Sequence, residues 1–237
     1  MSDLTASGIR ELQTSPAAHD AQYVSRCRLW AVSLAFLFFI LHLPILPSLT
    51  RSHGDETFYT DAAVGMIKSG DYLAPTYEDG TLRFRKPILA YWAVVAGYKA
   101  FGFNFFGSRF PFLVAGTATI WLSFELCLLL ARRADQALVA TAIIASNLTV
   151  QHTSIRSTPD MLLCALVLTS LLGFAGLVFE GLRIKWYLLA YFGAALAVAT
   201  KGLAGLLPVV YAFLYCGFGR VPGLRLRRLW HPWIVAL

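Results

Sequence analysis

The sequence predicts an all-α integral membrane protein whose helices cross the bilayer several times. Hydrophobic residues make up 57% of its 237 residues, charged residues only 14%, and the mean hydropathy is +0.62. This balance is typical of polytopic membrane proteins and excludes an ordinary soluble domain. A spanning helix needs about 20 mostly apolar residues. Five or six stretches approach that requirement, the third and fifth being short: Leu29–Leu46, Arg109–Leu130, Ala137–Val150, Met161–Phe179, Tyr187–Thr200 and Leu203–Phe218.

The first apolar run predicts a retained helix and not a cleaved signal peptide. It follows Arg26 and Arg28, as a signal peptide would, but it is too long for an h-region. No A-x-A-like cleavage site follows the run, which ends instead at Pro44 and Pro47. We therefore expect a cytoplasmic N-terminal tail over residues 1–28, ahead of the first span.

The remaining domain boundaries follow from the spacing of the apolar runs. We expect a polytopic transmembrane domain over residues 29–237, with a long first outer loop at about 48–108. A new apolar run begins at Trp233 and is still open at Leu237. We therefore expect this chain to be the N-terminal part of a longer polypeptide.

Basic residues near the helix ends predict the orientation, because cytoplasmic loops carry an excess of Lys and Arg. With a cytoplasmic N-terminus, the segments on that side carry eleven of the twenty Lys and Arg residues. The two short outer loops carry only Arg156 and Lys201, and the other seven run from Arg51 in the long loop to Arg109 directly after it. We therefore expect the long loop and both short loops to face the periplasm or exterior. The net charge of +7 follows from this topology and does not indicate nucleic acid.

The polar stretch His53–Trp92 holds most of the chemically capable residues. It opens with Asp55 and Glu56, and the run that follows predicts an amphipathic helix on the membrane surface, ended by Gly70. The expected apolar stripe of that helix is Phe58, Ala62, Gly65 and Met66. Acids also favour the first turn of any helix because of its dipole. Position alone therefore leaves a structural and a catalytic role equally open for the two acids.

Arg83, Arg85 and Lys86 form a basic cluster at the other end of this stretch. Such a cluster at a bilayer surface binds lipid headgroups nonspecifically. The sharper interpretation is that one of the three grips the phosphate of a particular lipid, as a point charge or a bidentate fork. Lys86 lies where the loop re-enters the membrane, just ahead of Tyr91 and Trp92, which suit an interface. This placement favours the sharper interpretation.

Two further charged residues flank later apolar runs on the expected outer side. Asp160, with Asp55 and Glu56, offers the hard oxygen ligands that divalent cations prefer. As an acid after Pro159, however, Asp160 also suits an ordinary helix start. Lys201 is costly near the bilayer unless it reaches water or a partner. It marks the outer turn between the last two helices, and a phosphate contact is the alternative.

Five short segments in a fixed order resemble a known group of enzymes. They are Asp55-Glu56, Gly70 to Pro75, Lys86-Pro87 with Tyr91-Trp92, Thr158 to Leu162, and Ala199 to Gly202 ahead of Leu207-Pro208. In this order they resemble the GT-C class of lipid-linked-sugar glycosyltransferases, in the superfamily of aminoarabinose transferases and protein O-mannosyltransferases. The resemblance covers the N-terminal part of such an enzyme, which continues with more helices and a soluble outer domain.

The resemblance implies a GT-C-like helical bundle and a reaction. A sugar passes from a polyprenyl phosphate to an acceptor lipid, glycan or protein on the outer face of the bacterial inner membrane. The implied catalytic residues are Asp55, as acid–base group, and Glu56. The implied contacts to the lipid phosphate are Lys86, Arg83, Arg85, Tyr59 and Lys201. A divalent cation (Mg²⁺, Mn²⁺ or Zn²⁺) would lie near Glu56 or Asp160.

Two positions depart from the aminoarabinose branch. Phe58 stands where an arginine usually follows the Asp-Glu pair, and Arg85 stands where an acid usually precedes Lys-Pro. These departures weigh against a family-style metal site and against lipid A as the acceptor. The sugar and the acceptor therefore stay open.

A lipid flippase or transporter and a non-catalytic polyprenyl-phosphate binder are the competing interpretations. Transporters often place polar residues inside discontinuous helices at the bilayer midplane. Here the charges lie outside the apolar runs, apart from Glu125 near the cytoplasmic end of the second. This pattern favours an enzyme.

Overall fold

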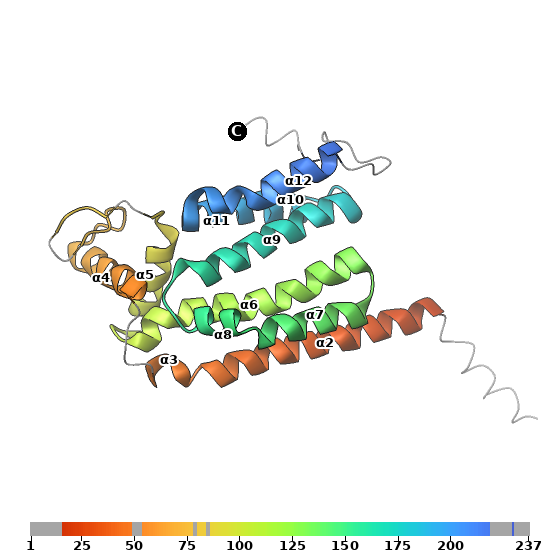
Figure 1. Ribbon diagram of the computed structural model, residues 1–237, viewed down its shortest axis with the longest axis horizontal. Coiled ribbons are helices and arrows are strands. Elements are labelled where there is room, and N and C mark those ends of the chain that lie inside the picture. Colours follow the sequence, from red (N-terminus) through yellow and green to blue (C-terminus); the bar gives the residue numbers. More distant parts are fainter. Residues whose placement is uncertain (1–15, 49–53, 78–79, 84–85, 219–228, 230–237) are drawn as a thin grey trace, which may run out of the picture.

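The computed structural model describes residues 16–48, 54–77, 80–83, 86–218 and 229. Within these residues the regular structure is helical, apart from one isolated β-bridge between Thr76 and Leu82. The long helices lie side by side, and the helices of the first loop, α4 and α5, cover one end of the bundle (Figure 1). The expected all-α bundle with helices in a long first loop is confirmed.

Helix α6 (Phe105–Ala131) forms the centre of the bundle. Helices α2 (Pro16–His42) and α7 (Ala134–Ser146) pack on one side of it, and α9 (Pro159–Phe179) packs on the other (Figure 1). Buried apolar side chains fill the contact with α2 and α7, namely Cys27, Ala31, Phe124, Ala134 and Ala137. The bundle is therefore built outward from the second apolar run.

The first helix begins at Pro16 and not at Leu29. Pro suits the first helical position, because it lacks an N–H that would be unpaired there. Residues 16–28 of the expected cytoplasmic tail are thus helical, while residues 1–15 lie outside the described part. Helix α2 ends at His42, just before Pro44, and the short helix α3 (Ile45–Ser48) follows.

The expectation of one helix over Ala137–Val150 is wrong. Asn147 divides it into α7 and the short helix α8 (Leu148–Ser154). The Oδ1 atom of Asn147 accepts hydrogen bonds from the backbone N–H groups of Thr149 and Val150, at 2.9 and 3.2 Å. An N-cap residue has extended and not helical backbone angles, so Asn147 ends one helix and starts the next.

The last apolar region is a hairpin of irregular helices. Its first arm consists of α10 (Ile184–Tyr187), a π-helical turn η1 (Leu188–Phe192) and α11 (Gly193–Lys201). The second arm consists of a 3₁₀ turn η2 (Gly202–Leu206) and α12 (Leu207–Phe218).

A tight backbone approach explains the turn of this hairpin. Gly202 has φ 62°, a left-handed value that favours glycine. A Cβ atom on Gly205 would lie 2.1 Å from the backbone nitrogen of Val198, so only glycine allows η2 to fold back on α11. Lys201 stands at this turn, as the sequence predicted.

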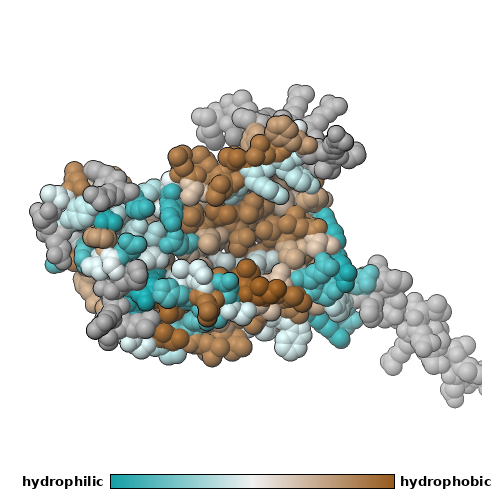
Figure 2. All heavy atoms as spheres, in the orientation of Figure 1, coloured by the Kyte–Doolittle hydropathy of each residue, from teal (hydrophilic) through white to brown (hydrophobic). Residues whose placement is uncertain are grey.

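Four described segments are long and apolar enough to cross a membrane, by length and composition: Asp20–Ser48, Phe105–Ala131, Pro159–Phe179 and Ile184–Phe218. Apolar side chains dominate the middle of the surface, whereas hydrophilic ones gather over α4 and α5 at one end and at the opposite ends of the long helices (Figure 2). The chain is therefore a multi-pass membrane protein, and its first-loop helices lie at one end of the apolar middle (Figure 2).

Helix α4 (Gly54–Ser69) turns a different face inward than the sequence predicted. Its buried residues are Glu56, Tyr59, Ala62, Ala63 and Met66. Ala62 and Met66 agree with the expected stripe, but Phe58 is 44% exposed. The buried face of α4 differs from the expected one because Glu56 has a buried partner, described below. Its end is as expected: Gly70 has φ 75° and donates to the carbonyl of Met66.

Helix α5 (Leu89–Phe101) closely approaches the start of α6. A Cβ atom on Gly97 would lie 2.0 Å from the carbonyl oxygen of Gly107. Helix α6 is capped there by Asn104, whose Oδ1 accepts from the N–H of Gly107 at 2.7 Å. These contacts fix the end of the bundle on which the candidate site is built.

Candidate functional site

The charged residues that the sequence singled out gather at the end of the bundle covered by α4 and α5. Asp55 lies in the first turn of α4, Asp160 in the first turn of α9, and Lys201 at the end of α11. These three helix ends face the same side of the molecule (Figure 1). The tertiary structure thus brings together residues that span about 150 positions of the sequence.

Asp55 is exposed at the start of α4. No ion pair among the described residues includes it. Its carboxylate therefore stands open at the surface of the site, in the geometry that an acid–base group needs to reach a substrate.

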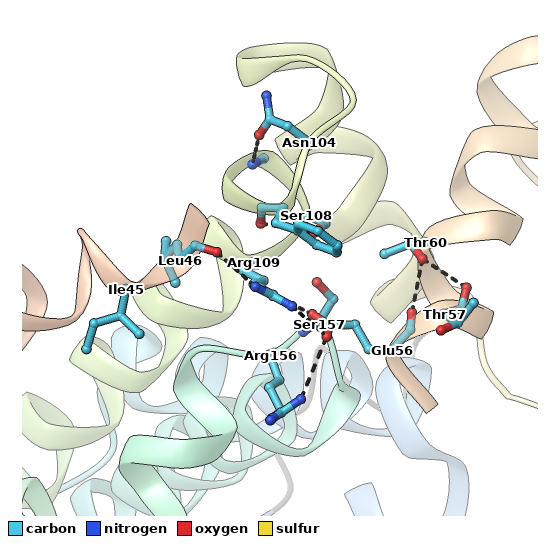
Figure 3. Close-up of polar contacts among 12 residues, drawn as sticks. Ile45, Leu46, Glu56, Thr57, Thr60, Asn104, Ser108, Arg109, Arg156 and Ser157 are labelled. Carbon is cyan, nitrogen blue, oxygen red and sulfur yellow. Dashed lines mark hydrogen bonds and ion pairs between the residues drawn. The ribbon is translucent and has the colours of Figure 1, made fainter. Parts of the chain in front are cut away.

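Glu56 points the opposite way, into a buried ion pair with Arg109 (Figure 3). Its Oε1 accepts from Nε of Arg109 at 2.7 Å, and its Oε2 accepts from Nη2 at 3.0 Å. Both side chains are fully buried. Oε1 also accepts from the backbone N–H of Ser157 at 3.0 Å, and Nη1 of Arg109 donates to the carbonyl of Leu46 at 2.9 Å.

This network leaves the Glu56 carboxylate no open side. Arg156 approaches as well, with its Nη1 atom 3.9 Å from Oε2 of Glu56. Nε of Arg156 lies 3.0 Å from Nε2 of His152. A catalytic or metal-ligating Glu56, as the resemblance implies, would first have to give up Arg109. The geometry favours a structural role for its carboxylate.

Arg83 lies in an aromatic cage. Its guanidinium carbon is 4.4, 5.1 and 5.8 Å from the ring centroids of Phe58, Tyr77 and Tyr59, respectively. Nε of Arg83 donates to the hydroxyl of Tyr91 at 2.9 Å. The side chain is buried, and in the described part of the chain no carboxylate pairs with it. The rings offset part of the cost of burying the cation, and its charge remains available to an anion.

Tyr59 connects the cage to the acids. Burial raises the pKa of Tyr59 to about 12, so its hydroxyl stays neutral and can donate. The charges of Asp55 and Asp160 shift this pKa in the same direction, and Arg83 opposes them. The ring of Tyr59 also packs against that of Tyr91 at 5.1 Å. Tyr59 therefore lies within electrostatic reach of both acids.

Lys86 is exposed directly before Pro87, where it can reach a ligand outside the bundle. Arg85 lies outside the described residues. Behind this segment, Nε1 of Trp92 donates to the carbonyl of Tyr72 at 2.8 Å, which ties α5 to the Gly70–Pro75 segment. The loop that presents Lys86 is thus anchored at both of its sides.

Asp160 and Lys201 form a half-exposed ion pair. The sequence treated them separately, as a metal ligand and a phosphate contact. In the structure each is the partner of the other, which explains how a lysine is accommodated beside the apolar region. Either role would require this pair to open.

The predicted divalent cation finds no ready ligand set in the described residues. No group of three or more His, Cys, Asp or Glu side chains there is placed to hold a metal ion. Glu56 faces Arg109 and Asp160 faces Lys201, so a metal at either would have to displace a cation. The described residues therefore do not fit a divalent cation, and the metal requirement stays a prediction.

Sequence reasoning missed Arg109 and Arg156 as members of this site, and it named Tyr91 in a motif segment without seeing its contact with Arg83. Arg109 is the first residue of the apolar run Arg109–Leu130, and it served only to mark where that run begins. A usable signal was present, because arginine inside a membrane helix is costly and needs a partner. What the sequence lacked was the partner's identity, which lies 53 positions away.

Comparison with known proteins identifies the family. The profile of the dolichyl-phosphate-mannose-protein mannosyltransferase family matches residues 85–237. The chain belongs to this family. Membership in the mannosyltransferase family confirms the resemblance drawn from the five motif segments at the level of the superfamily.

Relatives of this family member include enzymes of the aminoarabinose branch. A protein of Aquifex aeolicus without an assigned function is 33% identical over 163 residues, which are 68% of this chain and 32% of the relative. An undecaprenyl phosphate-alpha-4-amino-4-deoxy-L-arabinose arabinosyl transferase of Pseudomonas aeruginosa is 29% identical over 235 residues, which are 90% of this chain and 41% of the relative.

The fold is that of a solved relative. The crystal structure of ArnT from Cupriavidus metallidurans in the apo state matches with a TM-score of 0.72 at 23% identity, covering 85% of this chain and 37% of ArnT. The same enzyme bound to undecaprenyl phosphate matches with a TM-score of 0.64 at 22% identity. This chain spans less than half the length of these relatives.

Proposed function

We propose that this protein is the N-terminal part of a membrane glycosyltransferase that moves a sugar from a polyprenyl-phosphate donor to an acceptor. The observation that carries the proposal is that an exposed acid, Asp55, and a caged cation, Arg83, lie at the same end of the bundle, each without an ion-pair partner among the described residues. The relatives support the donor class, since several are named for undecaprenyl-phosphate sugars and one was solved with undecaprenyl phosphate.

The basic residues suit the phosphate of the donor. Lys86 is an exposed point charge, and Arg83 is a guanidinium held in place by Phe58 and Tyr59. A cation already fixed by its surroundings needs little reorganisation when charge develops on the leaving group. We assign these two residues, with Arg85, to the phosphate. Lys201 joins them only when its pair with Asp160 opens.

The reaction then follows from ordinary acid–base chemistry. The attacking O–H or N–H group of the acceptor adds to the anomeric carbon, and Asp55 takes its proton while the bond from that carbon to the phosphate oxygen breaks. The departing polyprenyl phosphate gains one negative charge, which Lys86 and Arg83 stabilise. We assign the acid–base role to Asp55 and not to Glu56, because both oxygens of Glu56 accept from Arg109.

The proposal includes an orientation. Arg26, Arg28, Arg132 and Arg133 lie at the end of the long helices opposite Asp55, and basic residues favour the cytoplasmic side. We therefore infer a cytoplasmic N-terminus, with the site on the periplasmic or outer face of the bacterial inner membrane.

The alternative of a transporter or flippase receives less support. Discontinuous helices that carry substrate place polar groups at their breaks. The π-helical break in the last apolar region has the sequence LLAYF, which carries no charge. Lys201, at the turn ahead of η2, is already paired with Asp160. A non-catalytic binder of polyprenyl phosphate remains the outcome that the following experiment distinguishes.

The test uses the purified protein in proteoliposomes with radiolabelled polyprenyl-phosphate sugars and a crude envelope fraction as acceptor. We compare Asp55→Asn and Lys86→Ala with two controls, Asp135→Asn and Lys68→Ala. Asp135 is also a first-turn acid but lies at the opposite end of the bundle, and Lys68 is an exposed lysine in the last turn of α4.

We expect transfer to fall by about 10²-fold or more in Asp55→Asn, since acid–base catalysis contributes about 10²–10⁴-fold. We expect a fall of about 10²–10³-fold in Lys86→Ala, the loss typical of removing one group that stabilises the developing charge. The two controls should retain wild-type transfer. Donor binding without transfer, unchanged in Asp55→Asn, would contradict the enzyme proposal and indicate a lipid binder or flippase.

A further inference from the structure

The buried ion pair of Glu56 and Arg109 connects four segments that are far apart in the sequence. Glu56 belongs to the first turn of α4 and Arg109 to the first turns of α6. Arg109 also donates to the carbonyl of Leu46 in α3, and Glu56 accepts from the N–H of Ser157, ahead of α9 (Figure 3). One carboxylate and one guanidinium therefore hold the ends of α3, α4, α6 and α9 together.

The bonds to Arg109 fix direction as well as distance. A guanidinium that bonds both oxygens of a carboxylate does so as a planar fork, which allows one relative orientation. The fork is held further by Phe105, whose ring centroid lies 4.5 Å from the guanidinium carbon of Arg109. The position of Glu56 is thus determined on all sides.

Asp55 directly precedes Glu56, so the fork controls where Asp55 stands. The first turn of a helix lacks intrahelical partners for its N–H groups, and helix ends fray. Asp55 itself is exposed and has no ion-pair partner among the described residues. Its place at the site depends on the neighbouring residue, whose side chain is anchored.

The same carboxylate sets the start of α9. Ser157 donates its backbone N–H to Glu56, and Thr158, Pro159 and Asp160 follow at once. Asp160 pairs with Lys201 at the turn of the last hairpin. Glu56 therefore sets the distance between Asp55 at the start of α4 and Asp160, the partner of Lys201, at the start of α9.

We propose that Glu56 and Arg109 are positioning residues, whose buried ion pair holds Asp55 in register with Asp160 and Lys201 for sugar transfer. This inference rests on the proposed function. It assigns a task to an ion pair that stability alone does not require, since a buried pair is often no more stable than apolar residues of similar volume.

The test separates positioning from folding. In the purified protein we measure kcat per folded molecule and the KM for the polyprenyl-phosphate donor in Arg109→Met, Arg109→Lys and Glu56→Gln. The matched control is Arg28→Met, which breaks another bidentate pair, 2.6 and 2.9 Å from Glu125, at the opposite end of the bundle.

We expect kcat to fall by about 10²-fold in Arg109→Met and Glu56→Gln, the loss typical of a displacement of about 1 Å at a catalytic group. The donor KM should change by less than about threefold, because Lys86 and Arg83 are untouched. Arg109→Lys, which keeps the charge and loses the fork, should recover only part of kcat. The control should keep wild-type values.

A second measurement is independent of activity. Hydrogen exchange followed by mass spectrometry should show faster exchange in Arg109→Met at residues 54–60 and 155–160 together, with α12 unchanged. In Arg28→Met neither segment should change. The two segments are named because Glu56 and Ser157 both lose their fixed geometry when the fork is removed.

Two results would overturn the inference. One is an unchanged kcat per folded molecule in Arg109→Met, and the other is unchanged exchange at both segments. The proposed function fails differently, namely if Asp55→Asn transfers sugar as well as the wild type. In that case the exchange measurement still decides whether the pair orders both segments.

Discussion

Removing one partner of the Glu56–Arg109 pair should destabilise the protein more than removing both. In Arg109→Met a buried carboxylate loses its cation, and in Glu56→Gln a buried guanidinium loses its anion. The double variant leaves neither charge in the interior. The two side chains are fully buried and joined by hydrogen bonds of 2.7 and 3.0 Å, so their energies are strongly coupled.

The magnitudes follow from burial. Breaking a buried pair by removing one partner costs about 3–5 kcal/mol, because the other charge is left uncompensated. The double variant should lose only about 1–3 kcal/mol, the cost of leaving the carbonyl of Leu46 without its donor. The exposed pair Arg133–Asp135 has a similar contact distance, 2.6 Å, but side chains that are 61% and 46% exposed. Its loss should cost about 0–1 kcal/mol.

The assay is denaturant-induced unfolding of the purified protein in detergent micelles, followed by the fluorescence of its six tryptophans. The wild type and the three variants of the cycle are measured beside Arg133→Met as the exposed control. If the two single variants lose less than about 1 kcal/mol each, or if their losses add in the double variant, then the reasoning from burial is refuted.

Three further predictions test local features of the fold. Tyr59→Phe should make the alkaline loss of stability less steep. The raised pKa of about 12 keeps the folded phenol of Tyr59 protonated while the unfolded phenol ionises near 10, so this residue's contribution to stability is lost between pH 10 and 12 in the wild type and is absent in the variant, as thermal unfolding across this range would show. Gly97→Ala should lower the free energy of unfolding by about 1–3 kcal/mol, because its Cβ atom meets the carbonyl of Gly107, whereas Gly54→Ala, with open space around it, should be nearly neutral in the same measurement. Asn104→Ala should cost about 1 kcal/mol in unfolding experiments, since the N-cap bond to Gly107 is lost, and an unchanged stability would mean that another group caps α6.

Much of the architecture could be predicted from local patterns. Apolar runs long enough to span a bilayer located the cores of α2, α6 and α9, and Lys201-Gly202 located the turn of the last hairpin. Hydropathy succeeds here because the bilayer requires each span to satisfy its own backbone hydrogen bonds. Where a side chain intervened, as Asn147 does by capping α8, the apolar pattern overstated the length of a helix.

The candidate site was only partly predictable. Asp55, Lys86 and Arg83 stood out because polar residues between apolar runs are few and their chemistry is plain. The rotation of α4 was not visible, since the apolar pattern favoured Phe58 inward, whereas the buried partner of Glu56 decides the face.

The sequence by itself therefore determined the class of protein, the positions of the main spans and the family-type motifs, because these depend on residues that are neighbours along the chain. Only the tertiary structure decided which of the two adjacent acids is buried and which is exposed. Glu56 meets Arg109 across 53 positions and Ser157 across 101, and this contact leaves Asp55 exposed. Pairings over such distances depend on how the helices pack, which no local pattern encodes.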